Sequence, residues 1–217
     1  MGQQRQKFLF IKYGEGMTES RIRSYIFGII LLSMIFLSCN FLSSPPVAEQ
    51  AENLPGGFNY NPEVPLDVND AFTRASDFLN NQEYERAEVI YREIIEKYAE
   101  NPDAYVGLGS ALFYQDKLDD ARDAYMQAFE ISEDSIPALI GLGSVELTSA
   151  NYEKAIEYYD QALQLDDELP EAHWGIAISY SKSGQVEAAI DHLETYLLLA
   201  PNGQFSDYAR ELLEELK

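Results

Sequence analysis

Cysteine and basic residues are scarce in this chain, and both shortages narrow what it can be. One cysteine, Cys39, occurs among the 217 residues, so no disulfide can form within the chain. From residue 40 onward, 10 Lys and Arg stand against 35 Asp and Glu. Nucleic acids are bound by neutralising their phosphates with basic side chains, so this composition argues against a nucleic-acid-binding function. An anionic bilayer would also repel this part of the chain.

Recognisable arrangements of catalytic or metal-binding residues are missing as well. Ser179 and Lys182 have the spacing of a serine acyl enzyme, but the companion motifs of those enzymes are absent. His173 and His192 fall on different predicted helices, and the one cysteine lies far away in the leader, which gives no zinc-binding pattern. We therefore predict a protein that is not an enzyme, with no catalytic residues, cofactor, metal or small-molecule substrate.

A single long apolar run is present, near the N-terminus. Residues 24–38 are apolar almost throughout, follow Arg21 and Arg23, and end at Cys39. Basic residues before an apolar run are typical of an export signal. The small residue Ser38 directly before the cysteine resembles a bacterial lipoprotein box, and this resemblance implies cleavage and lipidation at Cys39.

An uncleaved signal anchor is the alternative for this segment. Residues 24–44 are mostly apolar and just long enough to span a bilayer, in which case Cys39 is an ordinary thiol. Both interpretations keep the basic end in the cytoplasm and place the rest of the chain outside. We predict an extracytoplasmic, membrane-anchored protein in which residues 1–38 are a signal peptide or signal anchor. Which membrane holds it stays open, as does a start at Met1 or Met17.

The segment after the leader predicts a flexible tether at residues 39–66. Pro45-Pro46, Pro55-Gly56-Gly57 and Pro65 interrupt any helix, and no apolar period survives there. Because an anionic bilayer would repel the acidic repeats beyond the tether, the membrane contact is expected through the N-terminus only.

Beyond the tether, one small residue returns at a constant interval, called here the repeat step. Its positions are evenly spaced along the chain, at Ala87, Ala121, Ala155 and Ala189. Each unit contains two amphipathic helical patterns separated by a short polar break, such as residues 115–117 in the second unit. A period of about 34 residues with two helices per unit is the signature of a solenoid of helix-turn-helix hairpins.

Other residues of the units fit this interpretation. Small residues on the first helices are expected to let the two helices of a hairpin approach closely, and they are Ala75, Gly109, Gly143 and Ala177. Asn101 and Ser135 stand just before helix-starting prolines, where we expect them to cap the first helices of their units.

The second unit carries a specific pattern of aromatic, Leu-Gly, apolar, Ala and aromatic residues: Tyr105, Leu108-Gly109, Leu112, Ala121 and Tyr125. On these residues the chain resembles a tetratricopeptide repeat protein, and with the lipoprotein-like leader it resembles one of bacterial lipoprotein type. The resemblance implies an all-α, right-handed α-solenoid of four tetratricopeptide hairpins, at residues 67–100, 101–134, 135–168 and 169–202. A C-terminal capping helix at residues 203–217 would cover the last hairpin. One departure is Glu146, which occupies a usually apolar place.

Each first helix carries further apolar residues beside the stripe that packs within its hairpin. In tetratricopeptide repeat proteins this face lines the concave groove, so the resemblance implies a partner groove with serines keeping it open. The predicted groove residues are Phe72, Leu79, Val106, Ser110, Phe113, Tyr114, Ile140, Ser144, Leu147, Trp174 and Ile178. The alternative is that they pack between successive first helices or under the tether.

The predicted partner is a protein or peptide with an apolar or aromatic segment. The family's clamp for a C-terminal carboxylate uses basic side chains along the groove, and Lys182 is almost the only one there. We therefore predict a membrane-tethered, extracytoplasmic scaffold that binds a partner protein in the groove. Two alternatives are a non-catalytic accessory subunit of an envelope enzyme complex, and a scaffold that self-associates through its fourth repeat and terminal helix.

Overall fold

The computed structural model describes residues 67–217, which contain nine α-helices and no strand. The predicted leader, Cys39 and tether lie outside the described residues. The helices are α4 Val68–Asn80, α5 Tyr84–Lys97, α6 Pro102–Phe113, α7 Leu118–Ile131, α8 Ile136–Thr148, α9 Tyr152–Leu165, α10 Pro170–Ser183, α11 Val186–Leu199 and α12 Ser206–Leu216. Within residues 67–217, no helix combines the length and the apolar character that crossing a bilayer requires.

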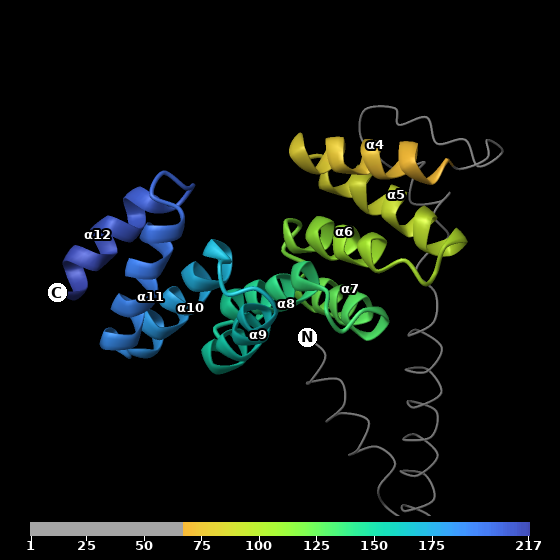
Figure 1. Cartoon of the computed structure of the whole chain (residues 1–217). Coiled ribbons are helices and arrows are strands. Elements are labelled where there is room, and N and C mark those ends of the chain that lie inside the picture. The colour runs from red at the N-terminus through yellow and green to blue at the C-terminus, as the bar shows by residue number, and fades with distance from the viewer. Residues whose placement is uncertain (1–66) are drawn as a thin grey trace, which may run out of the picture. The chain divides into compact units, whose positions relative to one another are not determined.

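The helices pair in chain order, as Figure 1 shows. α4 packs on α5, α6 on α7, α8 on α9 and α10 on α11, and α12 follows against α11. The second helix of each hairpin also packs on the first helix of the next one. The predicted all-α solenoid of four hairpins and a terminal helix is confirmed.

First and second helices form two different layers. The first helices touch one another along the array, α4 with α6, α6 with α8 and α8 with α10. Within residues 67–217 no second helix touches another second helix. The first helices therefore form the inner layer of the described array, and the second helices form the outer layer.

Short polar residues cap the first helices α6 and α8. Asn101 Oδ1 accepts a hydrogen bond from the Ala104 amide at 3.1 Å, and Ser135 Oγ accepts one from the Ala138 amide at 3.4 Å. Both predicted caps are confirmed, and each satisfies an amide that has no partner within its helix. These caps mark where α6 and α8 start, whereas α10 begins after Leu169 without a side-chain cap.

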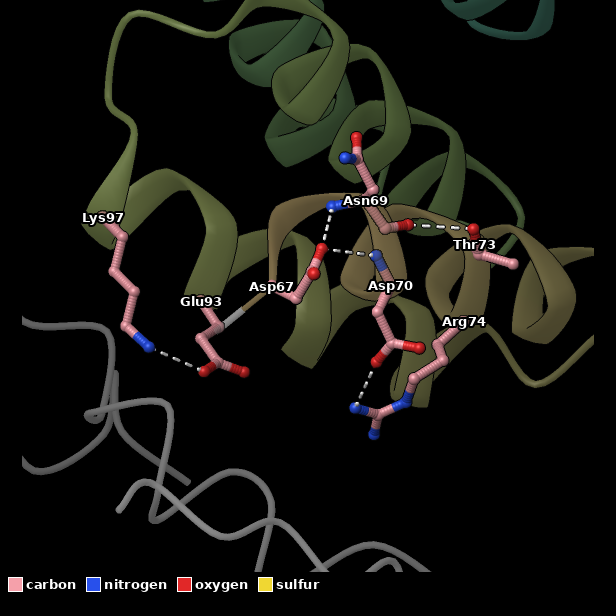
Figure 2. Close-up of polar contacts among 7 residues, drawn as sticks. All are labelled: Asp67, Asn69, Asp70, Thr73, Arg74, Glu93 and Lys97. Carbon is pink, nitrogen blue, oxygen red and sulfur yellow. Dashed lines mark hydrogen bonds and ion pairs between the residues drawn. The ribbon is translucent and has the colours of Figure 1, made fainter. Parts of the chain in front are cut away.

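Helix α4 uses an aspartate for the same purpose, as Figure 2 shows. Asp67 Oδ1 accepts hydrogen bonds from the amides of Asn69 at 2.9 Å and Asp70 at 3.2 Å. The hydroxyl of Thr73 donates to the Asn69 carbonyl at 2.8 Å. An exposed ion pair joins Arg74 to Asp70 at 3.8 Å in the same turn. The side chain of Asp67 also places a negative charge at the positive end of the helix dipole.

A second ion pair in Figure 2 belongs to helix α5. Lys97 Nζ lies 3.1 Å from Glu93 Oε1, four residues earlier in the last turn of α5. The Glu93 side chain is largely buried, and Lys97 supplies the opposite charge beside it. A buried carboxylate is costly without such a partner.

Tyrosines of the second helices explain the recurring glycines. The ring of Tyr125 lies against Gly109 in its own hairpin and Gly141 in the next. A Cβ on these glycines would lie 2.8 Å and 2.4 Å from the ring. The same arrangement recurs around Tyr159, between Gly143 and Gly175. Each ring thus fills a space that only glycine leaves open, and it joins two first helices and one second helix.

Glu146 is buried although its place is usually apolar. It is 3% exposed and accepts hydrogen bonds from Arg122 Nε at 2.7 Å and Asn151 Nδ2 at 2.6 Å. Burial alone would raise the pKa of Glu146, but the hydrogen bonds from Asn151 and Arg122 hold its pKa below the usual value. The departure is therefore a paired carboxylate at the boundary between two hairpins.

Candidate partner-binding face

The inner layer presents three rows of side chains, and the members of each row follow one another at the repeat step. Together they are called the inner face here. The first row is apolar, the second is mostly serine and the third is again mostly apolar. In order, the rows are Phe72, Val106, Ile140 and Trp174; Ser76, Ser110, Ser144 and Ile178; and Leu79, Phe113, Leu147 and Ser181.

The apolar members of these rows face both the core and the surface. Phe72 meets the Tyr91 ring edge-on, with centroids 6.1 Å apart. Each of the others also packs against buried core residues while part of its surface stays exposed: Leu79, Val106, Phe113, Ile140, Leu147, Trp174 and Ile178. These residues therefore belong partly to the core, and partner binding on this face stays a prediction.

The serines have a structural role that the sequence did not reveal. Ser110 Oγ donates to the Val106 carbonyl at 3.0 Å and lies 3.0 Å from the Tyr125 hydroxyl. A serine hydroxyl has one proton, so Tyr125 must donate to Ser110. Ser144 repeats the arrangement with the Ile140 carbonyl and Tyr159. The serines anchor the buried rings from the inner face.

Burial perturbs the acidity of these tyrosines. It raises the pKa of both Tyr125 and Tyr159 to about 12. The serine hydrogen bonds act in the opposite direction but do not cancel the effect of burial. Both phenols are therefore neutral at physiological pH and act as hydrogen-bond donors, not as acids.

Tyr114 stands apart from the three rows. It follows the end of α6, is 61% exposed, and stacks on Tyr84 at the start of α5 with ring centroids 5.1 Å apart. Phe113 meets Tyr114 edge-on at 5.6 Å. Of the eleven predicted groove residues, ten lie in the rows, and Tyr114 lies at the end of the hairpin beside Tyr84. A surface depression lined by residues 98–103, which are the loop after α5 and the first two residues of α6, lies outside the rows.

The terminal helix continues the first row. Tyr208 lies one repeat step after Trp174, and the two rings meet edge-on at 5.6 Å. Phe205 stacks on Trp174, with centroids 4.9 Å apart and planes 9° from parallel. The sequence predicted Phe205 and Tyr208 only as parts of a capping helix. The signal that would have found Tyr208 is the same repeat step that defines the rows.

Charge is divided between the two layers. The four first helices contain seven charged residues, whereas the four second helices contain nineteen. No member of the three rows is charged. Eight of the ten Lys and Arg of residues 67–217 already form ion pairs with carboxylates of the same chain. The inner face is therefore neutral within a strongly acidic molecule.

The two histidines lie closer together than the sequence indicated. His173 Nδ1 and His192 Nδ1 are 3.0 Å apart, and His173 Nε2 lies 3.2 Å from the Asp167 carbonyl. A carbonyl only accepts, so His173 is protonated on Nε2, and one proton lies between the two Nδ1 atoms. Burial, followed by the charge of His173, lowers the pKa of His192. Within residues 67–217, no group of three or more His, Cys, Asp and Glu could hold a metal ion.

The Ser-x-x-Lys pair does not form a catalytic arrangement. Ser179 is fully buried, and its hydroxyl donates to the Gly175 carbonyl at 2.8 Å. Lys182 is exposed at the end of α10. A nucleophile needs access to substrate and a base within hydrogen-bond reach, and Ser179 is enclosed by its own helix packing.

Comparisons with known proteins agree with this fold. Two family models for the tetratricopeptide repeat match residues 100–168 and 146–216. A structure of MamA from Desulfovibrio magneticus RS-1 is similar, with 15% identity, a TM-score of 0.57, and coverage of 68% of this chain and 92% of that one. The OM64 TPR domain of Arabidopsis has 14% identity, a TM-score of 0.51, and coverage of 54% and 93%.

The type III secretion translocator chaperone SycD of Yersinia enterocolitica is a third similar structure. It has 19% identity and a TM-score of 0.51, covering 53% of this chain and 90% of that one. No curated protein matches the chain in sequence. At these identities the likeness to solved structures concerns the fold. With the family matches and the paired helices together, the chain belongs to the tetratricopeptide repeat proteins, which are typically non-catalytic scaffolds for protein–protein interaction.

Proposed function

We propose that this chain is a membrane-tethered, extracytoplasmic scaffold that binds an apolar or aromatic segment of a partner protein on its inner face. The observation that carries the proposal is the division of charge between the layers. Nineteen charged residues lie on the four second helices, and none lies in the three rows of the inner face. Burying an uncharged surface against a partner avoids the large cost of desolvating charges.

The shape of the rows suits a side chain from a partner segment. Two apolar rows flank a row of small serines, so larger side chains stand on either side of a lower strip. The serine hydroxyls already bond to tyrosines and carbonyls of the array, so they need no partner for their protons. An amphipathic helix or an extended peptide is the ligand that such surfaces receive.

Photo-crosslinking in cells tests this assignment. A photoreactive phenylalanine replaces Val106 or Ile140 on the inner face, and Glu157 on the outer helix α9 serves as the matched control position. We expect the two inner positions to give the same protein adduct and the control position to give none. Adducts formed only from position 157, or from no position, would overturn the proposal.

The membrane setting rests on the leader and Cys39, and it is tested separately. Intact mass of the protein from membranes of its own cells, beside a Cys39→Ser variant, distinguishes the two anchors. Loss of residues 1–38 with added acyl chains, absent in the variant, is expected for a lipoprotein. A full-length mass without acyl chains in both would make the leader a signal anchor, and a soluble protein would contradict the tether.

A further inference from the structure

The C-terminal end of the inner face contains a stacked group of rings, Trp174, Phe205 and Tyr208, called here the terminal aromatic cluster. Trp174 comes from α10, Phe205 from the turn before α12, and Tyr208 from the first turn of α12. Phe205 lies parallel to Trp174 at 4.9 Å, and Tyr208 stands edge-on to it at 5.6 Å. Phe205 remains 38% exposed and Tyr208 remains 50% exposed. The other members of the first row are each less exposed than these two rings.

Hydrogen bonds hold the turn that carries Phe205. The Phe205 amide donates to the Tyr196 hydroxyl at 3.0 Å, and Ser206 Oγ donates to the Ala200 carbonyl at 2.7 Å. Arg210 spans the same turn, bonding to Asp207 at 2.7 Å and to the Pro201 carbonyl. The turn that carries Phe205 is therefore held in place before any ligand arrives, which lowers the entropic cost of binding.

Carboxylates flank the cluster on both of its helices. Glu171 lies three residues before Trp174 on α10, and Glu211 lies three residues after Tyr208 on α12, so each shares a helix face with its ring. Both glutamates are exposed, and among the ion pairs of residues 67–217 none involves either of them. Arg210, the cation of α12 nearest to them in sequence, is already paired with Asp207.

We infer that the terminal aromatic cluster anchors the partner, and that it receives an Arg or Lys side chain carried next to an apolar residue of the partner segment. This inference rests on the proposed function and specifies the partner's chemistry. A cation over an exposed ring gains from the ring's negative face, and carboxylates beside the ring add to that attraction. A second copy of the chain is a poor occupant, because it would bring an equally acidic surface to this one.

Selection from a random dodecapeptide library displayed on phage tests the inference, with the full chain immobilised in detergent. We expect enriched peptides to contain Arg or Lys within a few residues of an aromatic or aliphatic side chain. Their affinity should fall about tenfold in a Glu171→Gln, Glu211→Gln variant, which removes charge but keeps the rings. It should fall further in a Phe205→Ser, Tyr208→Ser variant. The matched control is Glu153→Gln, Glu157→Gln on α9, which removes equal charge from the outer layer.

The outcomes separate this inference from the proposed function. Enriched peptides without basic residues, or unchanged affinity in the Glu171→Gln, Glu211→Gln variant, would overturn the inference. Peptides whose binding depends on Val106 and Ile140 but not on the terminal aromatic cluster would support the proposed function and overturn the inference. Failure to enrich any peptide would count against both. A concentration-dependent dimer that Tyr208→Ser abolishes would identify a second copy as the occupant and likewise overturn the inference.

Discussion

Arg122 donates from Nε to Glu146 Oε1 at 2.7 Å across the boundary between the second and third hairpins. One repeat step earlier, the position equivalent to Arg122 carries the opposite charge, Glu88. Glu88 accepts hydrogen bonds from Lys117 and Gln115 of the next hairpin, both at 2.9 Å. Burial alone would raise the pKa of Glu88, but Lys117, Gln115 and Arg92 together hold its pKa below the usual value.

Each boundary between hairpins thus has its own chemistry. At the boundary between the first and second hairpins, α5 contributes the carboxylate of Glu88. At the next boundary, α7 contributes the guanidinium of Arg122. At the third boundary, α9 contributes Ile156, which packs in one cluster with Tyr180. A hairpin placed in the wrong order would leave a buried charge facing a like charge or an apolar side chain. The boundaries therefore favour one order of the repeats.

Removing one partner of the Arg122–Glu146 pair should lower the free energy of unfolding more than removing both partners does. Arg122→Met leaves the Glu146 carboxylate buried without its cation, and we expect a loss of about 3 kcal/mol in the free energy of unfolding. Adding Glu146→Leu, which places there the residue found at Leu112 one repeat earlier, should restore most of it. Chemical denaturation of both variants measures the difference. Arg74→Met, at the exposed pair with Asp70, is the control and should change little.

The sequence could predict features that recur in every hairpin, but not side-chain contacts that occur at one boundary only. Small residues at helix crossings recur at every unit, so the constant period predicted the helices and the rows of the inner face. The partners of Glu146 could not be predicted, because Arg122 is equivalent to Glu88 and Ile156 and no period marks it. Contacts between side chains of different types follow from the three-dimensional arrangement and leave no repeating signal.

The serines and the terminal rings show a second limit. Ser110 and Ser144 recur at the correct step, but their bonds to Tyr125 and Tyr159 depend on where each ring points after packing. The sequence alone does not distinguish a serine that only leaves space from a serine that anchors a ring by a hydrogen bond. Phe205 was missed for a related reason, because it lies in a turn and has no equivalent in the rows.

Gly141→Ala should destabilise the array through Tyr125. The added Cβ would lie 2.4 Å from the ring, closer than real side-chain atoms approach, and a buried ring between two helices has little room to move. We expect a loss of about 1 to 3 kcal/mol in the free energy of unfolding. In a Tyr125→Leu background the same substitution should cost clearly less, since the obstructing ring is gone. Equal costs in both backgrounds would show that Gly141 is needed for its backbone and not for the ring.

Alkaline pH should destabilise the fold through its buried tyrosines. The pKa of Tyr125 and of Tyr159 is about 12 in the folded protein and 10 when unperturbed. The two neutral phenols therefore make their full contribution to the free energy of unfolding below pH 10. This contribution is lost as pH rises toward 12. Each pKa difference corresponds to about 2 to 3 kcal/mol once both states are ionised. Thermal melting across this range should show a smaller decline in a Tyr125→Phe, Tyr159→Phe variant, and an equal decline would contradict this assignment.

Mild acid should loosen the last hairpin through its histidine pair. Burial and the neighbouring His173 lower the pKa of His192 below 6.5, while Asp160 on α9 and Asp191 on α11 act in the opposite direction. The unfolded chain then binds the proton on His192 more tightly than the folded chain does. The contribution of the histidine pair to the free energy of unfolding is therefore complete above pH 6.5 and falls as pH drops below it. The Nδ1 atoms of His173 and His192 face each other at 3.0 Å, so one proton fits between them but two protons would repel each other. We expect the melting temperature to fall between pH 7 and 5, and a His173→Gln variant to fall less. An NMR titration that gives His192 an ordinary pKa, or an equal pH dependence of the melting temperature in both proteins, would contradict this origin.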